Sequence, residues 1–172
     1  SVTSEVLDVA TTGYAEFSFG MDDMGEDETF TLYGTAYNAV WVGANGTLAF
    51  GGTEAPGADA THENTVGISA LRADIEGGEV SAAVTEGTFV VDWAGVATVV
   101  ADAGAKTGEA VNTSNVQVQG DLDSSTDSPG QIDIFFEAVD DDLTEVTVGV
   151  SSGEAGAVVD GRDSSPDVQA AV

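Results

Sequence analysis

Apolar and polar residues alternate with a period of two along most of the chain. In one such segment Phe89, Val91 and Trp93 share one side. Because successive side chains of a strand point to opposite faces, this alternation predicts strands with one buried face and makes these residues candidate core positions. The predicted strands are Glu5–Val9, Tyr14–Phe19, Thr29–Tyr33, Tyr37–Ala44, Thr47–Phe50, Val66–Ala73, Glu79–Thr85, Thr88–Val96, Asn115–Leu122, Gln131–Ala138, Glu145–Val150 and Ala155–Asp160.

A second segment separates its two faces equally cleanly. Ile132, Ile134 and Phe136 lie on one side, and Asp133 and Glu137 lie on the other. No long window carries apolar residues at the spacing of an amphipathic helix. The sequence therefore predicts an all-β fold, an antiparallel β-sandwich of about 10–12 short strands.

Turn residues connect several of these strands. Asn45-Gly46 and Glu86-Gly87 each stand between two apolar segments, which is the two-residue signature of a type I′ hairpin. The polar segment Asp121–Gly130 is predicted to be the loop of a hairpin with an open tip.

The chain divides into an N-terminal arm, one domain and a tail. Residues 1–13 form a strand or arm, residues 14–160 an acidic β-sandwich domain, and residues 161–172 a tail containing glycine, serine and proline. Residues 97–111 fit either a strand with a loop or one helical turn. A chain of 172 residues is long enough for one core, which buries roughly 70% of the unfolded surface.

The net charge is the feature of the composition that most constrains the function and the environment of the protein. The chain has 31 acidic residues and three basic ones, which gives a net charge of −28. Nucleic-acid binding is excluded because phosphate contacts require clustered lysine and arginine. Mutual repulsion amounts to about 50 kcal/mol in salt-free water and to a few kcal/mol once salt screens it, so we expect a saline environment. No apolar run approaches the roughly 20 residues of a membrane helix, so no membrane insertion is expected.

The residue types present in the chain give little support for a catalytic function. The chain has no cysteine, which removes thiol catalysis and thiolate metal sites, and its single histidine is His62. His62 lies in a loop without a nucleophile-elbow sequence, and pairs of carboxylates are uninformative where acidic residues are so abundant. We expect no enzyme activity and no required cofactor.

The order of the strand motifs resembles the nidogen-like (NIDO-type) extracellular modules, including those of prokaryotic surface proteins. The resemblance covers roughly residues 14–151. It implies an extracellular β-sandwich that serves adhesion, matrix or cell-surface assemblies and has no catalytic residues. The lack of cysteine and the acidity depart from the animal members, so a secreted or cell-surface protein of a saline habitat is expected. The matching motifs are Phe17-Ser18-Phe19, Tyr33-Gly34-Thr35-Ala36-Tyr37, residues 40–51, residues 68–74, residues 89–96, Val116-Gln117-Val118, residues 132–136 and residues 146–150.

Acidic clusters are candidate calcium sites, because Ca²⁺ takes six to eight oxygen ligands from carboxylates and carbonyls. One of these clusters, Asp121, Asp123 and Asp127, lies on a predicted loop, and its spacing is the most typical of calcium ligands. It lacks the glycine and glutamate positions of an EF-hand. The alternative is a solvated, salt-adapted surface. The candidates are Asp22, Asp23, Glu26, Asp27 and Glu28 in the first cluster, Asp121, Asp123 and Asp127 in the second, and Asp140, Asp141 and Asp142 in the third.

Two aromatic residues are candidate contacts for a glycan or another partner. Trp41 competes with Val40 and Val42 for the inward face of its strand, and Tyr37 begins the same segment. If these rings are exposed, they favour carbohydrate binding. A calcium-assisted, carbohydrate-binding module is therefore the alternative function.

The N-terminal segment bears on assembly. Val2, Val6 and Val9 belong to a strand-like stretch that precedes the nidogen-like motifs. This stretch either pairs within its own sandwich or completes the sheet of a neighbouring copy by strand addition. The leading hypothesis is a non-catalytic surface module that forms a homo-oligomer or a filament.

Overall fold

The computed structural model describes residues 4–9, 13–57, 59–61, 64–72, 75–76, 78–98, 113–125, 128–138 and 147–154. These residues form strands and turns and contain no helix, so none of them belongs to a helix that could span a membrane. The strands are β1 (Glu5–Val6), β2 (Tyr14–Ser18), β3 (Phe30–Leu32), β4 (Thr35–Tyr37), β5 (Ala39–Gly43), β6 (Thr47–Ala49), β7 (Val66–Arg72), β8 (Ile75–Glu76), β9 (Glu79–Thr85), β10 (Thr88–Thr98), β11 (Thr113–Asp121), β12 (Ile132–Ala138) and β13 (Thr147–Ser152).

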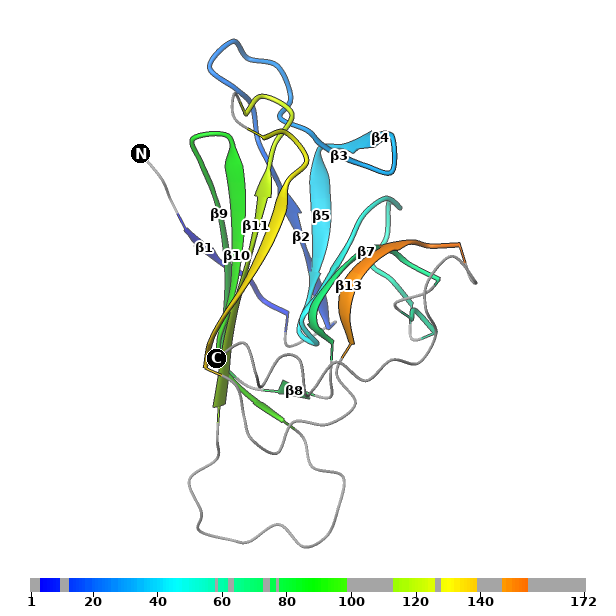
Figure 1. The fold of residues 1–172 in the computed structure, drawn as a ribbon, viewed down its shortest axis with the longest axis vertical. Coiled ribbons are helices and arrows are strands. Elements are labelled where there is room, and N and C mark those ends of the chain that lie inside the picture. Colours follow the sequence, from blue (N-terminus) through cyan, green and yellow to red (C-terminus); the bar gives the residue numbers. More distant parts are fainter. Residues whose placement is uncertain are drawn as a thin grey trace, which may run out of the picture.

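Two antiparallel sheets face each other (Figure 1). Sheet A has the order β1-β9-β10-β11-β12, and β8 pairs with the far end of β10. Sheet B has the order β13-β7-β6-β5-β2. The hairpin β3-β4 forms a small sheet of its own beside one end of the sandwich. The prediction of an all-β antiparallel β-sandwich is confirmed.

The core lies between the two sheets. Phe89, Val91 and Trp93 of β10 are fully buried, as their alternation predicts. The indole Nε1 of Trp93 donates a hydrogen bond of 2.9 Å to the carbonyl oxygen of Gly43 on β5. This bond connects sheet A to sheet B inside the core, and it gives the buried indole N–H of Trp93 a hydrogen-bond partner.

The predicted core positions of β12 are only half-buried. Ile132, Ile134 and Phe136 pack against the core from one side, because β12 is the last strand of sheet A and none of the described strands lies beyond it. The alternation therefore identifies the correct face of the strand, and the position of the strand in the sheet sets how deeply that face is buried.

Aromatic rings close the end of the core near the β3-β4 hairpin. The Phe19 ring stacks on Phe89 with centroids 5.1 Å apart, and Phe30 meets Phe89 edge to face at 5.2 Å. Phe30 also stacks on Phe50 at 5.5 Å. These geometries are the favoured ones for aromatic pairs, so this end of the sandwich is firmly packed beneath its loops.

The observed turns agree with the predicted turn types only in part. Glu86 and Gly87 have φ values of 50° and 78°, so the predicted type I′ turn between β9 and β10 is confirmed. The hairpin at Asn45-Gly46 is also present, but the type I′ prediction is wrong there. Gly46 alone has a positive φ, of 77°, and its N–H bonds to the carbonyl of Gly43 in a longer turn.

A third hairpin, which joins β3 to β4, is not among the predicted ones. Tyr33 and Gly34 have φ values of 49° and 79° and form a two-residue turn between β3 and β4. The short strands β4 and β8 were likewise not predicted. The predicted strand Ala155–Asp160 and the tail of residues 161–172 lie outside the described residues, as do residues 99–111 of the unassigned segment.

Replacing Glu86 with asparagine is expected to raise the free energy of unfolding by about 1 kcal/mol. Glu86 holds a left-handed conformation that costs most side chains this order of energy and that asparagine tolerates. Urea unfolding at constant high salt measures the change. Glu86→Gln is the matched control, since it removes the same charge and keeps a side chain of the same shape. An equal gain in both variants would assign the effect to charge and contradict the turn argument.

Candidate functional site

The N-terminal strand is held at the free edge of sheet A by few interactions. In β1, Glu5 pairs with Ala82 and Val6 pairs with Ser81 on β9. Leu7 follows, and its N–H donates to the carbonyl of Val80 at 2.8 Å. The side chain of Leu7 is 7% exposed and belongs to the core. The two-residue strand, the buried side chain of Leu7 and the half-buried side chain of Val9 thus hold the described part of the arm in place.

The predicted assembly residues lie at different depths. Val6 is 62% exposed on the outer face of sheet A, and Val9 is half-buried against the core. Val2 lies outside the described residues. The sequence reasoning missed Leu7, the anchoring residue. The signal was present, because Leu7 shares a strand face with Val9.

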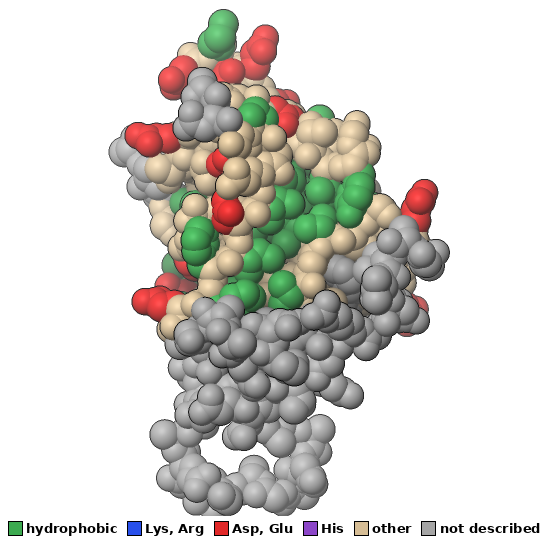
Figure 2. All heavy atoms as spheres, in the orientation of Figure 1, with side chains coloured by type: hydrophobic (Ala, Val, Ile, Leu, Met, Phe, Trp, Pro, Cys, Tyr) green, Lys and Arg blue, Asp and Glu red, His purple; other side chains and the backbone are tan. Residues whose placement is uncertain are grey.

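On one side of the sandwich, the last described strands of the two sheets have no described strand beyond them. β12 is the last strand of sheet A and β13 the last of sheet B. Ile134 and Phe136 on β12 and Val148 and Val150 on β13 are half-buried. Figure 2 shows hydrophobic side chains gathered at the centre of this face of the molecule. Unpaired strand edges next to apolar surface are the features that strand addition uses.

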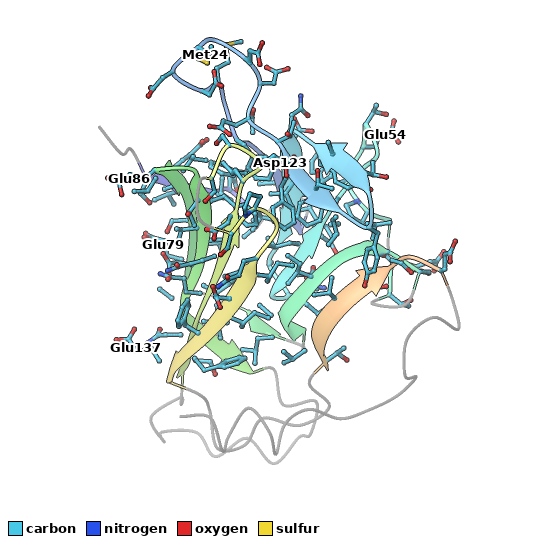
Figure 3. The ribbon with its side chains drawn as sticks, turned by 45° about the horizontal axis from the view of Figure 1, so that its top comes forward. Met24, Glu54, Glu79, Glu86, Asp123 and Glu137 are labelled. Carbon is cyan, nitrogen blue, oxygen red and sulfur yellow. The ribbon has the colours of Figure 1, made fainter. Side chains whose placement is uncertain are left out.

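The first acidic cluster forms a loop that projects from the end of the sandwich, with Met24 near its tip (Figure 3). The Oδ1 atom of Asp22 accepts hydrogen bonds from the backbone N–H groups of Met24 at 2.8 Å and Glu26 at 2.9 Å. The side chains of Asp23 and Glu26 are exposed. Asp22 therefore shapes the loop, and its two neighbours face solvent.

Glu28 is the most deeply buried acidic residue of the described chain, with 8% of its surface exposed. Its two carboxylate oxygens lie 2.8 and 2.6 Å from the hydroxyl of Ser124, which comes from the loop after β11. Glu28 and Ser124 line a cleft of about 430 Å³ together with Asp22, Asp23 and Glu86. The structure thus brings the loop of the first acidic cluster against a residue of the second loop.

Asp121 and Asp123 of the second acidic cluster make hydrogen bonds to different parts of the fold. Asp121 accepts a hydrogen bond of 2.8 Å from the hydroxyl of Thr88 on β10. Asp123 accepts bonds from the hydroxyls of Thr29 and Thr31, both at 2.8 Å, and so fastens its loop to β3. Asp127 and the third predicted cluster, residues 140–142, lie outside the described residues. Within the described ranges no three acidic or histidine side chains are arranged to hold a metal ion, and calcium binding stays a prediction.

The two candidate aromatic residues do not share a surface. The Tyr37 ring packs on Phe50 with centroids 5.4 Å apart and is half-buried at the aromatic end of the core. Val40 and Val42 fill the inward face of β5, so Trp41 projects from the outer face of sheet B, where it is half-buried between Glu16 and Ala49. His62 lies outside the described residues.

A groove that the sequence reasoning missed runs over the outer face of sheet A. It has a volume of about 510 Å³. The exposed ring of Phe135 on β12 lies beside Gln117 of β11, which in turn pairs with Asp92 of β10. The signal was the pair Phe135-Phe136, because one of two adjacent aromatic residues in a strand must face outward. Figure 3 shows Glu137, another residue of the groove, on this outer side of the sheet.

Comparisons with known proteins returned no match. No family model, no curated protein and no solved structure matches the chain. The nidogen-like resemblance stays a prediction.

Proposed function

We propose that the chain is a non-catalytic, extracellular or cell-surface structural module of a saline environment, whose copies join through the N-terminal strand. The order of strand motifs that resembles nidogen-like modules supports the extracellular assignment. The net charge of −28 supports the saline setting, because repulsion of this size needs screening.

The observation that carries the proposal is the way β1 is held. Two residue pairs and the single buried side chain of Leu7 anchor the arm at the edge of β9. Strands with so few contacts open at a small fraction of the global free energy of unfolding. A neighbouring copy can supply the same strand to the same edge, so exchange preserves every contact that the arm makes.

The open side between β12 and β13 supplies a second acceptor. No described strand pairs with the outer edge of β12 or of β13, and Ile134 and Val150 supply half-buried apolar surface along this side. An arm released from β9 can add to this side of another copy as an extra strand. Both routes depend on movement of the N-terminal strand, which makes the arm the element to test.

A cysteine pair at positions 6 and 81 tests the arm directly. Leu7 bonds to Val80, so Val6 and Ser81 form the adjacent non-hydrogen-bonded pair, with Cα atoms about 4.5 Å apart and within reach of a disulfide. The chain has no other cysteine. In Val6→Cys/Ser81→Cys, oxidation of the assembled protein is expected to give a covalent ladder on a denaturing gel if arms are exchanged at β9. If released arms add elsewhere, oxidation of the monomer is expected to abolish assembly and reduction to restore it.

The single variants Val6→Cys and Ser81→Cys are the controls, because each gives at most a disulfide-linked dimer. Light scattering at high salt reports the assembly state in every case. An internally linked monomer that still assembles like the wild type would contradict the proposal. So would a wild-type protein that stays monomeric at every concentration.

Calcium-assisted binding is the second candidate function, and the buried carboxylate of Glu28 is the observation that favours it. Among the described residues, the hydroxyl of Ser124 is the one side-chain group that bonds to this carboxylate, in a cleft lined by three further acidic residues. A hydroxyl has one proton to donate, so within the described part of the chain one carboxylate oxygen is left for a cation. The comparison of calcium with magnesium described in the Discussion tests this candidate.

A further inference from the structure

Five residues lie in register across sheet A on its outer face. The row runs from Val6 on β1 through Ser81, Asp92 and Gln117 to Phe135 on β12, each paired with the next. Paired residues of antiparallel strands have their side chains on the same face, about 4.8 Å from strand to strand. The row therefore places an aromatic ring and a set of polar groups side by side along the groove.

The polar groups of the row are already oriented. The amide of Gln119 donates to Gln117 Oε1 at 2.5 Å, and Gln117 Nε2 donates to Asp92 Oδ1 at 2.8 Å. The second carboxylate oxygen of Asp92 accepts no hydrogen bond from the described residues. Gln117 Nε2 retains its second proton, so a fixed acceptor and a fixed donor stand next to each other in the groove.

Phe135 supplies an apolar platform beside this pair. Its side chain is 50% exposed, although the inward-facing Phe136 next to it packs on the core. An exposed aromatic ring presents a face of negative potential that attracts polarised C–H groups. A concave surface with one exposed aromatic ring and a few oriented polar groups is typical of ligand sites.

We propose that this groove binds a neutral sugar residue of a glycan chain. The C–H face of the sugar ring would lie on Phe135, and two adjacent hydroxyls would donate to Asp92 and accept from Gln117. A diol both donates and accepts, which matches a carboxylate next to an amide, whereas an ammonium group can only donate.

The negative charge of the groove restricts the class of glycan that can bind there. The groove contains Asp92 and Glu137, and these carboxylates would be in direct contact with a bound uronate or sulfate, where salt screens little, so an anionic glycan would be repelled even at high salt. The polar residues of the row between Val6 and Phe135 also offer little apolar area to a second protein surface. A neutral glycan is the ligand that this chemistry fits.

An NMR titration tests the site with defined probes. Oligosaccharides of glucose, of mannose and of N-acetylglucosamine are added to the full chain at high salt, with oligogalacturonate as the anionic probe. We expect saturable shifts of the Phe135 ring signals, assigned by comparison with Phe135→Ala, for at least one neutral probe and none for oligogalacturonate. Phe135→Ala is expected to weaken binding about tenfold or more, and Gln117→Leu by a similar factor.

Tyr33→Ala is the matched control. It removes another exposed aromatic ring, on the turn between β3 and β4, and is expected to leave glycan affinity unchanged. Thermal unfolding verifies that each variant is folded. The proposal is overturned if no neutral probe shifts the Phe135 signals, if Phe135→Ala binds as tightly as the wild type, or if oligogalacturonate binds equally well. It is also overturned if Phe135→Ala abolishes self-association instead, because the face would then be an interface between copies.

Discussion

Replacing Trp93 with alanine is expected to lower the free energy of unfolding by about 3 to 5 kcal/mol, a large part of the stability of a domain this size. Trp93 is 1% exposed and has one of the largest buried side chains of the core. Its truncation leaves a cavity between the sheets. It also removes the indole N–H that donates to the Gly43 carbonyl at 2.9 Å, and leaves that carbonyl with the longer bond of 3.3 Å from the N–H of Gly46. Urea unfolding at high salt, followed by circular dichroism, measures the loss.

Two variants separate the contributions of packing and hydrogen bonding. Trp93→Phe keeps most of the apolar volume and removes the N–H donor, so we expect a loss of about 1 to 3 kcal/mol. Trp41→Ala removes the same side chain from the outer face of sheet B, where it is only half-buried. It is expected to cost clearly less than Trp93→Ala. Equal losses at positions 41 and 93 would contradict the role of Trp93 as the link between the two sheets.

Transfer from molar salt to about 10 mM salt is expected to unfold the protein. With 28 net negative charges there are roughly 380 like-charge pairs, and their unscreened repulsion of about 50 kcal/mol exceeds the stability of typical domains. The screening length grows from about 3 Å at 1 M to about 30 Å at 0.01 M, so repulsion across the whole domain returns on dilution. Tryptophan fluorescence and circular dichroism during dilution follow the transition. A melting temperature that does not depend on salt would contradict this expectation.

The same dilution distinguishes screening from specific calcium binding. Calcium and magnesium chloride at equal, low concentrations screen charge equally, so restoration of the fold by both ions indicates screening alone. Restoration by calcium and not by magnesium would assign a calcium site, and Glu28→Gln is expected to abolish that difference if the cleft near Ser124 holds the ion. The exposed Asp23→Asn is the matched control for the loss of one charge.

The interactions near the two acidic loops show why acidic residues are hard to assign from a sequence. Asp123 and Asp22 look like ligands by spacing, yet Asp123 binds the hydroxyls of Thr29 and Thr31, and Asp22 binds backbone N–H groups of its own loop. Thr29 and Thr31 are more than ninety positions from Asp123 in the chain. Spacing alone does not reveal such distant partners, because they depend on how the loops meet.

The sequence by itself determined the class of fold and the inward face of most strands. Phe89 and Val91 are buried as their alternation predicts, and Glu86-Gly87 forms the predicted turn, because both properties depend on residues that are adjacent in the chain. Alternation reports two faces of a strand, and a turn reports local backbone angles.

Only the tertiary structure decided which strands are edges and which faces remain exposed. It made Leu7 the anchor of the arm, left Ile134 half-buried at an edge, and aligned Phe135 with Gln117 and Asp92 across neighbouring strands. These properties depend on the register between segments far apart in the sequence. The physical reason is that burial and side-chain pairing across a sheet are set by the partner strand, which the local pattern does not identify.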